Sequence, residues 1–391
     1  MTTTAPATVP MIDDPVTTDV RSTVRRLLTA ECSSQDLLTF VAGDRDYNDA
    51  LWRRLGRDLG LTALLVPEEW GGAGASTREA AAVLTELGRA AAPVPYLSSA
   101  VLATTALIEA AVLPSAGVPA ARAALDTLLD GGIGVLAVPA TQAPRDPCTP
   151  TAATTSTSDG RVRVSGTVTH VLGAADAGTI LVPADHDGRT ALILVAADTD
   201  GVTVRRRTSI DLTRPTSDMR FDAVYGEILA HGDDASRILR SSLETAAALL
   251  AAEQVGLCEW ALDTSVDYLK ARYQFGQPIG SNQALRHRTA QLWIDVNHAR
   301  AAAVYAASTR ASGSDDAATA LAQAHCSETA LHLVESAIQI HGGVGFAWEH
   351  PLHLYLKRAF ADSVLLGDSQ THRRALAGFI DIAAPHAESS R

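Results

Sequence analysis

The stretch Tyr268-Leu-Lys-Ala-Arg-Tyr-Gln-Phe-Gly-Gln-Pro-Ile279, with Gln339-Ile-His-Gly-Gly-Val-Gly-Phe-Ala-Trp-Glu-His350 downstream, is the most informative part of this sequence. Arg272 follows a helical segment with one apolar face, so its guanidinium can reach beyond the packed helix and bind a pyrophosphate with paired hydrogen bonds. Gly342 and Gly343 carry no Cβ, so backbone NH groups there can approach a cofactor closely. Taken alone, such an arginine is more often a surface cation at a helix end, and such a glycine pair is more often a plain turn.

Helical periodicity extends outward from both stretches. Apolar residues recur every three to four positions, which is typical of amphipathic helices that bury one face. The expected C-terminal helices are 241–272, 282–312, 316–340 and 371–383. They predict a C-terminal four-helix bundle within a helical domain over residues 233–385.

The segment before this domain is rich in β-branched residues. Its short runs are separated by Gly, Asp and Pro, which is typical of strands in a small sheet or barrel over residues 131–232. The expected strands are 162–171, 179–182, 191–195 and 201–204. Residues 147–158 are expected to be an exposed loop, residues 19–130 an N-terminal helical domain, and residues 1–18 a disordered lead. The predicted fold class is therefore α+β, with helices, strands and helices in that order.

Composition and charge exclude several classes of function. The 391-residue chain has a formal net charge of −12 and no basic cluster, so neither nucleic acid nor an anionic membrane is an expected partner. No apolar run approaches the roughly 20 residues that span a bilayer, and no targeting segment is recognisable. The four cysteines form no CxxC pair, which suits a reducing compartment. We therefore expect a cytoplasmic protein.

The two stretches quoted first resemble the signature of the acyl-CoA dehydrogenase family, Arg-x-x-Phe-Gly-x-Pro-Ile with a following Gln, and Gln-x-x-Gly-Gly-x-Gly. The loop Val66-Pro-Glu-Glu-Trp-Gly-Gly72 and the expected domain order resemble the family as well. The resemblance implies a tetrameric FAD enzyme that desaturates an acyl-CoA or another acyl thioester and passes electrons to an electron-transfer acceptor. It also implies contacts to the phosphates and adenosine of a flavin whose ring lies in a neighbouring subunit. These contact residues are Arg272, Phe275, Gln283, Gln339, Gly342, Gly343 and Gln370.

The sequence departs from the family at the catalytic base. Acyl-CoA dehydrogenation removes an α-proton while the β-hydrogen leaves as hydride to the flavin, so it needs a carboxylate over the α-carbon. By resemblance, Leu366 stands at the usual base position and Ala246 at the alternative one. Glu244 and Asp368 are the nearest carboxylates in sequence, although each could be a solvated or capping residue. The catalytic residue therefore stays unassigned.

Further departures concern the side of the flavin ring. The family's Thr-Glu-Pro loop is replaced by Ala137-Val-Pro-Ala-Thr-Gln142, and its Trp-Ile-Thr segment by His170-Val-Leu172. A chain of this kind could complete the flavin site of a competent second dehydrogenase subunit, as in actinobacterial heteromers that act on bulky or sterol-derived thioesters. The alternatives are a homo-oligomer with another base, a non-catalytic structural or regulatory subunit, and a diverged flavin oxidase or tailoring dehydrogenase.

Other chemistries find little support in the sequence. His341, His350 and His353 lie in or just after the second stretch without a Cys or carboxylate at ligand spacing, so no metal site is expected. The chain has no G-x-S-x-G elbow for a serine hydrolase and no G-x-x-x-x-G-K-[ST] loop for phosphoryl transfer. It also lacks the strand, G-x-G-x-x-G and helix unit that binds nicotinamide cofactors.

Overall fold

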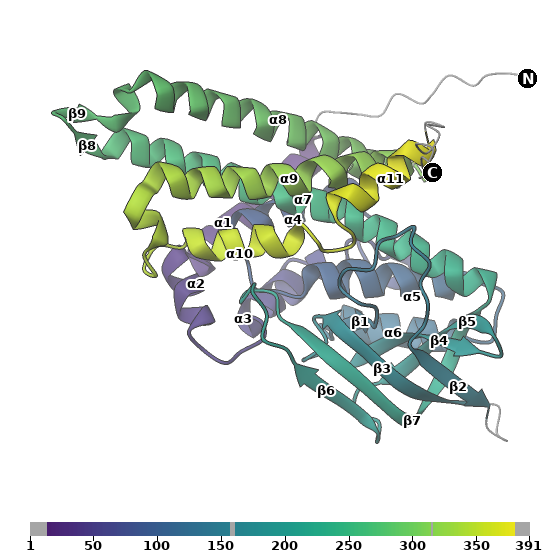
Figure 1. Ribbon diagram of the computed structural model, residues 1–391. Coiled ribbons are helices and arrows are strands. Elements are labelled where there is room, and N and C mark those ends of the chain that lie inside the picture. The colour runs from purple at the N-terminus through teal and green to yellow at the C-terminus, as the bar shows by residue number, and fades with distance from the viewer. Residues whose placement is uncertain (1–13, 157–160, 314–315, 380–391) are drawn as a thin grey trace, which may run out of the picture.

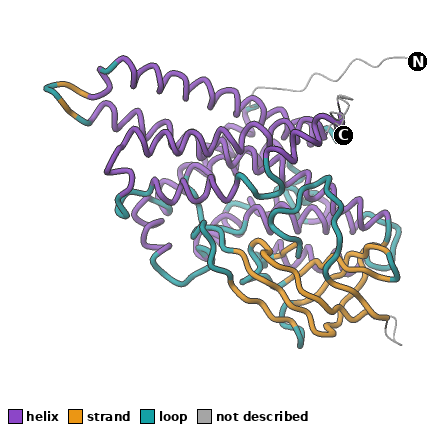
Figure 2. The backbone as a smooth tube through the Cα atoms, viewed as in Figure 1, coloured by secondary structure: helices purple, strands orange, loops and turns teal. Residues whose placement is uncertain are grey.

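The computed structural model describes residues 14–156, 161–313 and 316–379 (Figure 1). The strands gather at one side of the molecule (Figure 2), the N-terminal helices lie next to them, and the C-terminal helices extend across the opposite side (Figure 1). This arrangement confirms the predicted α+β class with its helical, β and helical parts. Within the described ranges, no helix has both the length and the apolar composition to cross a membrane.

The N-terminal helices begin at residues that suit helix starts. They are α1 Pro15–Glu31, α2 Ser34–Val41, α3 Asp49–Arg53, α4 Thr77–Arg89, α5 Thr104–Ala111 and α6 Val118–Leu129. The Asp14 side chain accepts a hydrogen bond from the Thr17 NH, and Pro15 fits the first turn, so α1 begins inside the predicted lead 1–18. Residues 1–13 of that lead lie outside the described residues. Ser76 and Glu79 form a capping box at the start of α4.

The β domain is a largely antiparallel sheet. Its strands are β1 Gly134–Leu136, β2 Ala152–Ser156, β3 Val162–Leu172, β4 Thr179–His186, β5 Arg189–Ala196, β6 Val202–Arg206 and β7 Thr216–His231. The strand order is β1-β4-β2-β3-β7-β5, and β5 also pairs with β4, which closes the sheet into a barrel. The four expected strands are confirmed. Residues 147–158 were wrongly expected to be a loop throughout, because β2 is polar and exists through its pairing with β3.

The C-terminal domain is organised around one long helix. Its helices are α7 Asp233–Ala271, α8 Gln283–Ala311, α9 Asp316–His341, α10 Leu352–Asp362 and α11 Ser369–Phe379. The 39 residues of α7 extend for about 58 Å at 1.5 Å per residue, and α7 packs against α4, α8 and α9. A Cβ on Gly256 of α7 would lie 2.0 Å from the Thr85 carbonyl oxygen of α4. Glycine therefore sets the close approach of these two helices.

A buried ion cluster joins the β domain to two C-terminal helices. Arg358 of α10 donates to Glu253 of α7 at 2.9 Å and contacts Asp211 at 3.3 Å, and Arg214 donates to Asp362 at 2.7 Å and also to Glu253. Burial raises the pKa of Asp362 to about 7. The neighbouring carboxylates Glu253 and Asp211 also raise this pKa, whereas Arg214 and Arg358 lower it. The cluster holds three carboxyl groups and two guanidinium groups, so we expect one carboxyl group, that of Asp362, to keep its proton near neutral pH.

Candidate functional site

The projecting tip of the C-terminal domain carries the first predicted cofactor residues. Arg272 caps α7 in an extended conformation, and the short strands β8 Tyr273–Gln274 and β9 Gln277–Pro278 form a hairpin between α7 and α8. Figure 1 shows this hairpin at the far end of both helices. Phe275 lies at the turn with φ +52° and a fully exposed side chain (100%), and Arg272 is also exposed. Both side chains are therefore available to a ligand or a second chain.

The second stretch reaches the same end of the domain. The ring of His341, the last residue of α9, stacks on Tyr268 of α7 with the ring centres 4.4 Å apart. This contact places Gln339, Gly342 and Gly343 at the end of α7 that carries Arg272. Gly342 has φ +60°, and no atom lies within 4 Å of where a Cβ would stand on either glycine. The backbone here faces open space, as close approach by a cofactor requires.

The tip offers one wall of a binding site. Gln283, the first residue of α8, is exposed like Gln339 and Arg272. A guanidinium and accessible backbone NH groups fit a pyrophosphate, and the exposed ring of Phe275 fits a planar group. Because these residues protrude, a ligand held by them would need its other wall from a second chain.

Gln370 lies apart from the tip. It is the second residue of α11, and its neighbour Ser369 donates a hydrogen bond to Glu328 of α9 at 2.7 Å. Glu328 precedes Gln339 by eleven residues, which is about 16 Å along a helix. The structure therefore separates the predicted cofactor residues into a group of six at the tip and Gln370 farther along α9.

The two vacated base positions are buried in apolar surroundings. Leu366 is 1% exposed, and its backbone NH donates to the Ala140 carbonyl at 2.8 Å. The carbonyl of Leu366 accepts from Nε2 of His372 at 3.0 Å, so the loop is held from both sides. Ala246 of α7 is fully buried. Neither residue can accept a proton.

The nearest carboxylates already have structural partners. Glu244 lies between two guanidinium groups, 3.6 Å from Arg145 and 3.4 Å from Arg310. Asp368 caps α11 by accepting from the Thr371 NH at 2.8 Å, and hydrogen bonds from Thr371 hold the pKa of Asp368 below its usual value. Both residues therefore act in ion pairing and capping here.

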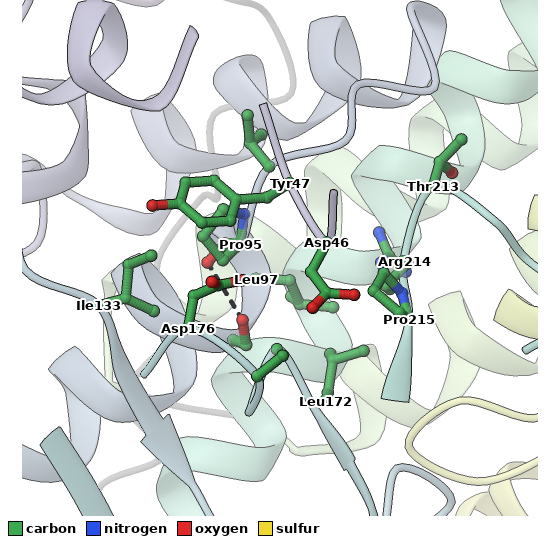
Figure 3. A pocket seen from close by; sticks show the side chains of 14 residues that line it. Asp46, Tyr47, Pro95, Leu97, Ile133, Leu172, Asp176, Thr213, Arg214 and Pro215 are labelled. Atoms are coloured by element: carbon green, nitrogen blue, oxygen red, sulfur yellow. Dashed lines mark hydrogen bonds between the residues drawn. The ribbon is translucent and has the colours of Figure 1, made fainter. Parts of the chain in front are cut away.

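A small cavity borders Leu172, at the end of the segment His170–Leu172. Figure 3 shows Asp46, Tyr47 and Asp176 around it, together with Arg214 of the buried ion cluster. Its volume of about 30 Å³ has room for one or two water molecules. A flavin ring does not fit in this cavity.

The three histidines near the tip make local contacts. The His341 ring bonds through Nδ1 to the Ala337 carbonyl at 2.7 Å, and His353 contacts the Trp348 carbonyl through Nε2 at 3.2 Å. Burial lowers the pKa of His341, His350 and His353, so the neutral imidazoles prevail near pH 7. Nowhere in the described part of the chain do three or more His, Cys, Asp or Glu side chains group as a metal site would require.

Comparison with known proteins identifies the family. The model of the acyl-CoA dehydrogenase N-terminal domain matches residues 15–114, and that of the C-terminal domain matches residues 236–380. The chain is 33% identical over 358 residues to acyl-CoA dehydrogenase IpdE2 of Mycolicibacterium smegmatis, covering 91% of this chain and 96% of that protein. This chain belongs to the acyl-CoA dehydrogenase family. The family comprises oxidoreductases that act on acyl-CoA and use FAD.

Two solved structures of acyl-CoA dehydrogenases resemble the chain over nearly its whole length. The ChsE4-ChsE5 complex of Mycobacterium tuberculosis aligns with a TM-score of 0.83 and 27% identity, covering 96% of this chain and 100% of that one. A variant of the Tcur3481-Tcur3483 steroid ACAD aligns with a TM-score of 0.81 and 28% identity, covering 93% of this chain and 97% of that one. Each of these structures is named for two different components. The chain is thus similar to acyl-CoA dehydrogenases that form mixed assemblies.

Proposed function

We propose that this chain is one subunit of a heteromeric, FAD-dependent acyl-CoA dehydrogenase whose second subunit supplies the catalytic glutamate. The observation that carries the proposal is an asymmetry within the site. The tip residues that fit a dinucleotide are present and accessible, whereas both base positions hold buried apolar residues. Such a chain can complete the cofactor site of a partner without performing the proton transfer itself.

The residues of the tip would hold FAD by its phosphates and adenosine. Arg272 would pair with the pyrophosphate, the NH groups near Gly342 and Gly343 would approach the same charges, and Phe275 would contact a planar ring. When bound, FAD supplies the acceptor for the hydride that leaves the β-carbon of the thioester. Because the tip has no second wall, the partner must enclose the remainder of the cofactor and exclude water from it.

The proton step is assigned to the partner. In the described residues around the vacated positions, Leu366 and Ala246 carry no ionisable group, Glu244 lies between two arginines, and Asp368 caps a helix. A base must lie within hydrogen-bonding reach of the proton that it removes, and these residues do not offer one. The same observations weigh against a homo-oligomer that uses either carboxylate.

For the substrate, we propose a bulky acyl-CoA thioester, such as one derived from a steroid side chain. The support is the similarity to a protein described as a steroid ACAD, together with the 27% and 28% identities to the two complexes. An electron-transfer acceptor would then reoxidise the flavin. We propose a cytoplasmic location, which fits the spacing of the four cysteines.

Visible absorbance tests the proposal directly. We would purify the chain alone and together with a second acyl-CoA dehydrogenase of its organism that carries a glutamate at the position of Leu366. A steroid-derived acyl-CoA is then added without oxygen. We expect flavin absorbance and its bleaching only in the mixture. A lone chain that is yellow and bleaches would refute the proposal and favour a diverged oxidase or tailoring dehydrogenase.

A matched pair of arginine variants assigns the tip. We expect Arg272→Ala to lower the flavin content of the mixed assembly at least tenfold, and Arg272→Lys to restore only part of it because lysine lacks the planar fork. Arg237→Ala is the control, since Arg237 is an exposed arginine that pairs with Glu109 and Asp234 of this chain. Equal flavin content in all four proteins would show that the tip does not hold the cofactor.

A non-catalytic structural subunit is the second candidate, and the apolar residues Leu366 and Ala246 favour it. In that case the mixture would form a stable complex whose flavin content does not depend on Arg272. The flavin content of the mixed assembly and its response to Arg272→Ala therefore separate the two candidates.

A further inference from the structure

The outer face of α10 carries two half-buried polar side chains and two exposed apolar ones in a helical pattern. His353, Lys357, Phe360 and Val364 follow one another at steps of four, three and four residues, so they share one face of α10 and the turn after it. Phe360 is 49% exposed and Val364 42%. The opposite face of α10, with Leu354 and Arg358 among others, is buried against the rest of the domain.

Two aromatic residues of the preceding segment extend this surface. Phe346 ends the short helical turn Gly342–Phe346 and is 78% exposed, and Trp348 is 54% exposed. The indole of Trp348 stacks on His353 with the ring centres 4.4 Å apart, and the Lys357 ammonium lies 5.0 Å from its centre. We call Phe346, Trp348, Lys357, Phe360 and Val364 the α10 stripe.

The stripe is continuous with the tip. The turn Gly342–Phe346 contains the two glycines of the tip at one end and the first aromatic residue of the stripe at the other. Figure 1 shows α10 beside α9. A chain that covers the tip therefore has a direct route onto the stripe. Exposed tryptophan and phenylalanine in such a position are typical of interface anchors.

We propose that the second dehydrogenase subunit covers the α10 stripe, with an apolar surface over the aromatic residues and a carboxylate opposite Lys357. The inference rests on the proposed function, which requires a partner at the tip. A second copy of this chain is the weaker occupant, because it lacks the catalytic carboxylate that the assembly needs. The indole of Trp348 is held by His353 and Lys357 before docking, so little side-chain freedom is lost on binding.

Because the chain contains few lysines, chemical labelling of amines can test the inference. The chain contains two lysines, Lys270 beside the tip and Lys357 in the stripe. Amine acylation followed by mass spectrometry therefore reports both places separately, with the N-terminal amine as an internal reference. We expect labelling of Lys357 in the mixed assembly to fall at least fivefold below that in the lone chain at the same dilute concentration.

The outcomes separate the inference from the proposed function. If the mixture binds flavin but labels Lys357 as fast as the lone chain does, the inference fails and the proposed function stands. If no assembly and no flavin appear, both fail. Protection of Lys357 in the lone chain, with a matching dimer by light scattering, would assign the stripe to a second copy and overturn the inference.

Paired serine variants give an independent measurement. We expect Phe360→Ser to raise the Kd for the partner at least tenfold, while flavin content at saturating partner stays unchanged because Phe360 lies outside the tip. Val112→Ser is the control, since Val112 is an apolar residue 64% exposed at the end of α5. Circular dichroism confirms that both variants are folded. Equal Kd values for the two variants would overturn the inference.

Discussion

The substitution Asp362→Asn tests whether Asp362 of the buried ion cluster is protonated in the folded protein. The pKa of Asp362 is about 7, against 3.8 for an ordinary aspartate, because burial outweighs the attraction of Arg214 and Arg358. The gap corresponds to about 4 to 5 kcal/mol at roughly 1.4 kcal/mol for each pH unit, of which about 3 kcal/mol falls between pH 4.5 and pH 8. Asparagine keeps a carbonyl oxygen that can accept from Arg214, as Oδ1 of Asp362 does at 2.7 Å.

The sign of the effect follows from the two protonation equilibria. The unfolded chain loses the Asp362 proton near pH 3.8, whereas the folded chain keeps it until about pH 7. The free energy of unfolding contributed by this group therefore falls as the pH rises from about 4 to 7, and stays low above that. The variant has no such group, so its stability relative to the natural chain should increase over the same interval.

Urea unfolding, followed by tryptophan fluorescence at pH 4.5, 6, 7 and 8, measures this difference. We expect Asp362→Asn to be nearly neutral at pH 4.5 and more stable than the natural chain by about 3 kcal/mol at pH 8. Asp263→Asn is the control, because Asp263 is 57% exposed and its effect should be small. A constant difference, or a less stable variant at pH 8, would show that Asp362 is ionised in the folded protein.

Three further predictions concern packing and capping. Gly256→Ala should lower the free energy of unfolding by at least about 3 kcal/mol, because the new Cβ meets the Thr85 carbonyl. Gly378→Ala, in open space on α11, should raise the free energy of unfolding by about 0.5 to 1 kcal/mol. Thermal unfolding of the two variants distinguishes these effects. Leu366→Ala should cost about 2 to 5 kcal/mol and leave the rate of flavin bleaching in the mixed assembly unchanged, and a tenfold slower rate would give this position a part in catalysis. Asp368→Ala should cost about 1 kcal/mol through the lost cap of α11, and a loss of bleaching in a folded variant would contradict the capping role.

The features that depend on local chemistry could be predicted from the residues alone. Helical periodicity located α7, α8 and α9 to within about eight residues at the start of α7 and one residue elsewhere, because apolar residues recur at helical spacing along all three. The signature stretches placed Arg272 at the end of α7 and the glycine pair at the end of α9, since a capped helix end and a glycine turn are encoded within a few residues. The family followed from the same stretches.

The features that depend on distant partners became visible only in the folded chain. β2 and β7 form because each pairs with β3. The sequence of β2 is polar and shows no alternation of polar and apolar residues, so a strand could not be predicted there. The helix α10 was not among the expected helices, and its packing against α7 and α9 is seen only in the structure. The ion cluster joins residues as far apart as 211 and 358.

The site shows the same division. Residue types alone indicated that Leu366 and Ala246 are not bases, but the ion pairs of Glu244 and the capping role of Asp368 required the folded chain. The spacing of the motifs gave no sign that Gln370 lies along α9 while the other six cofactor residues meet at a tip. Sequence patterns report what a residue can do locally, whereas which residues meet is set by the packing of whole helices and strands.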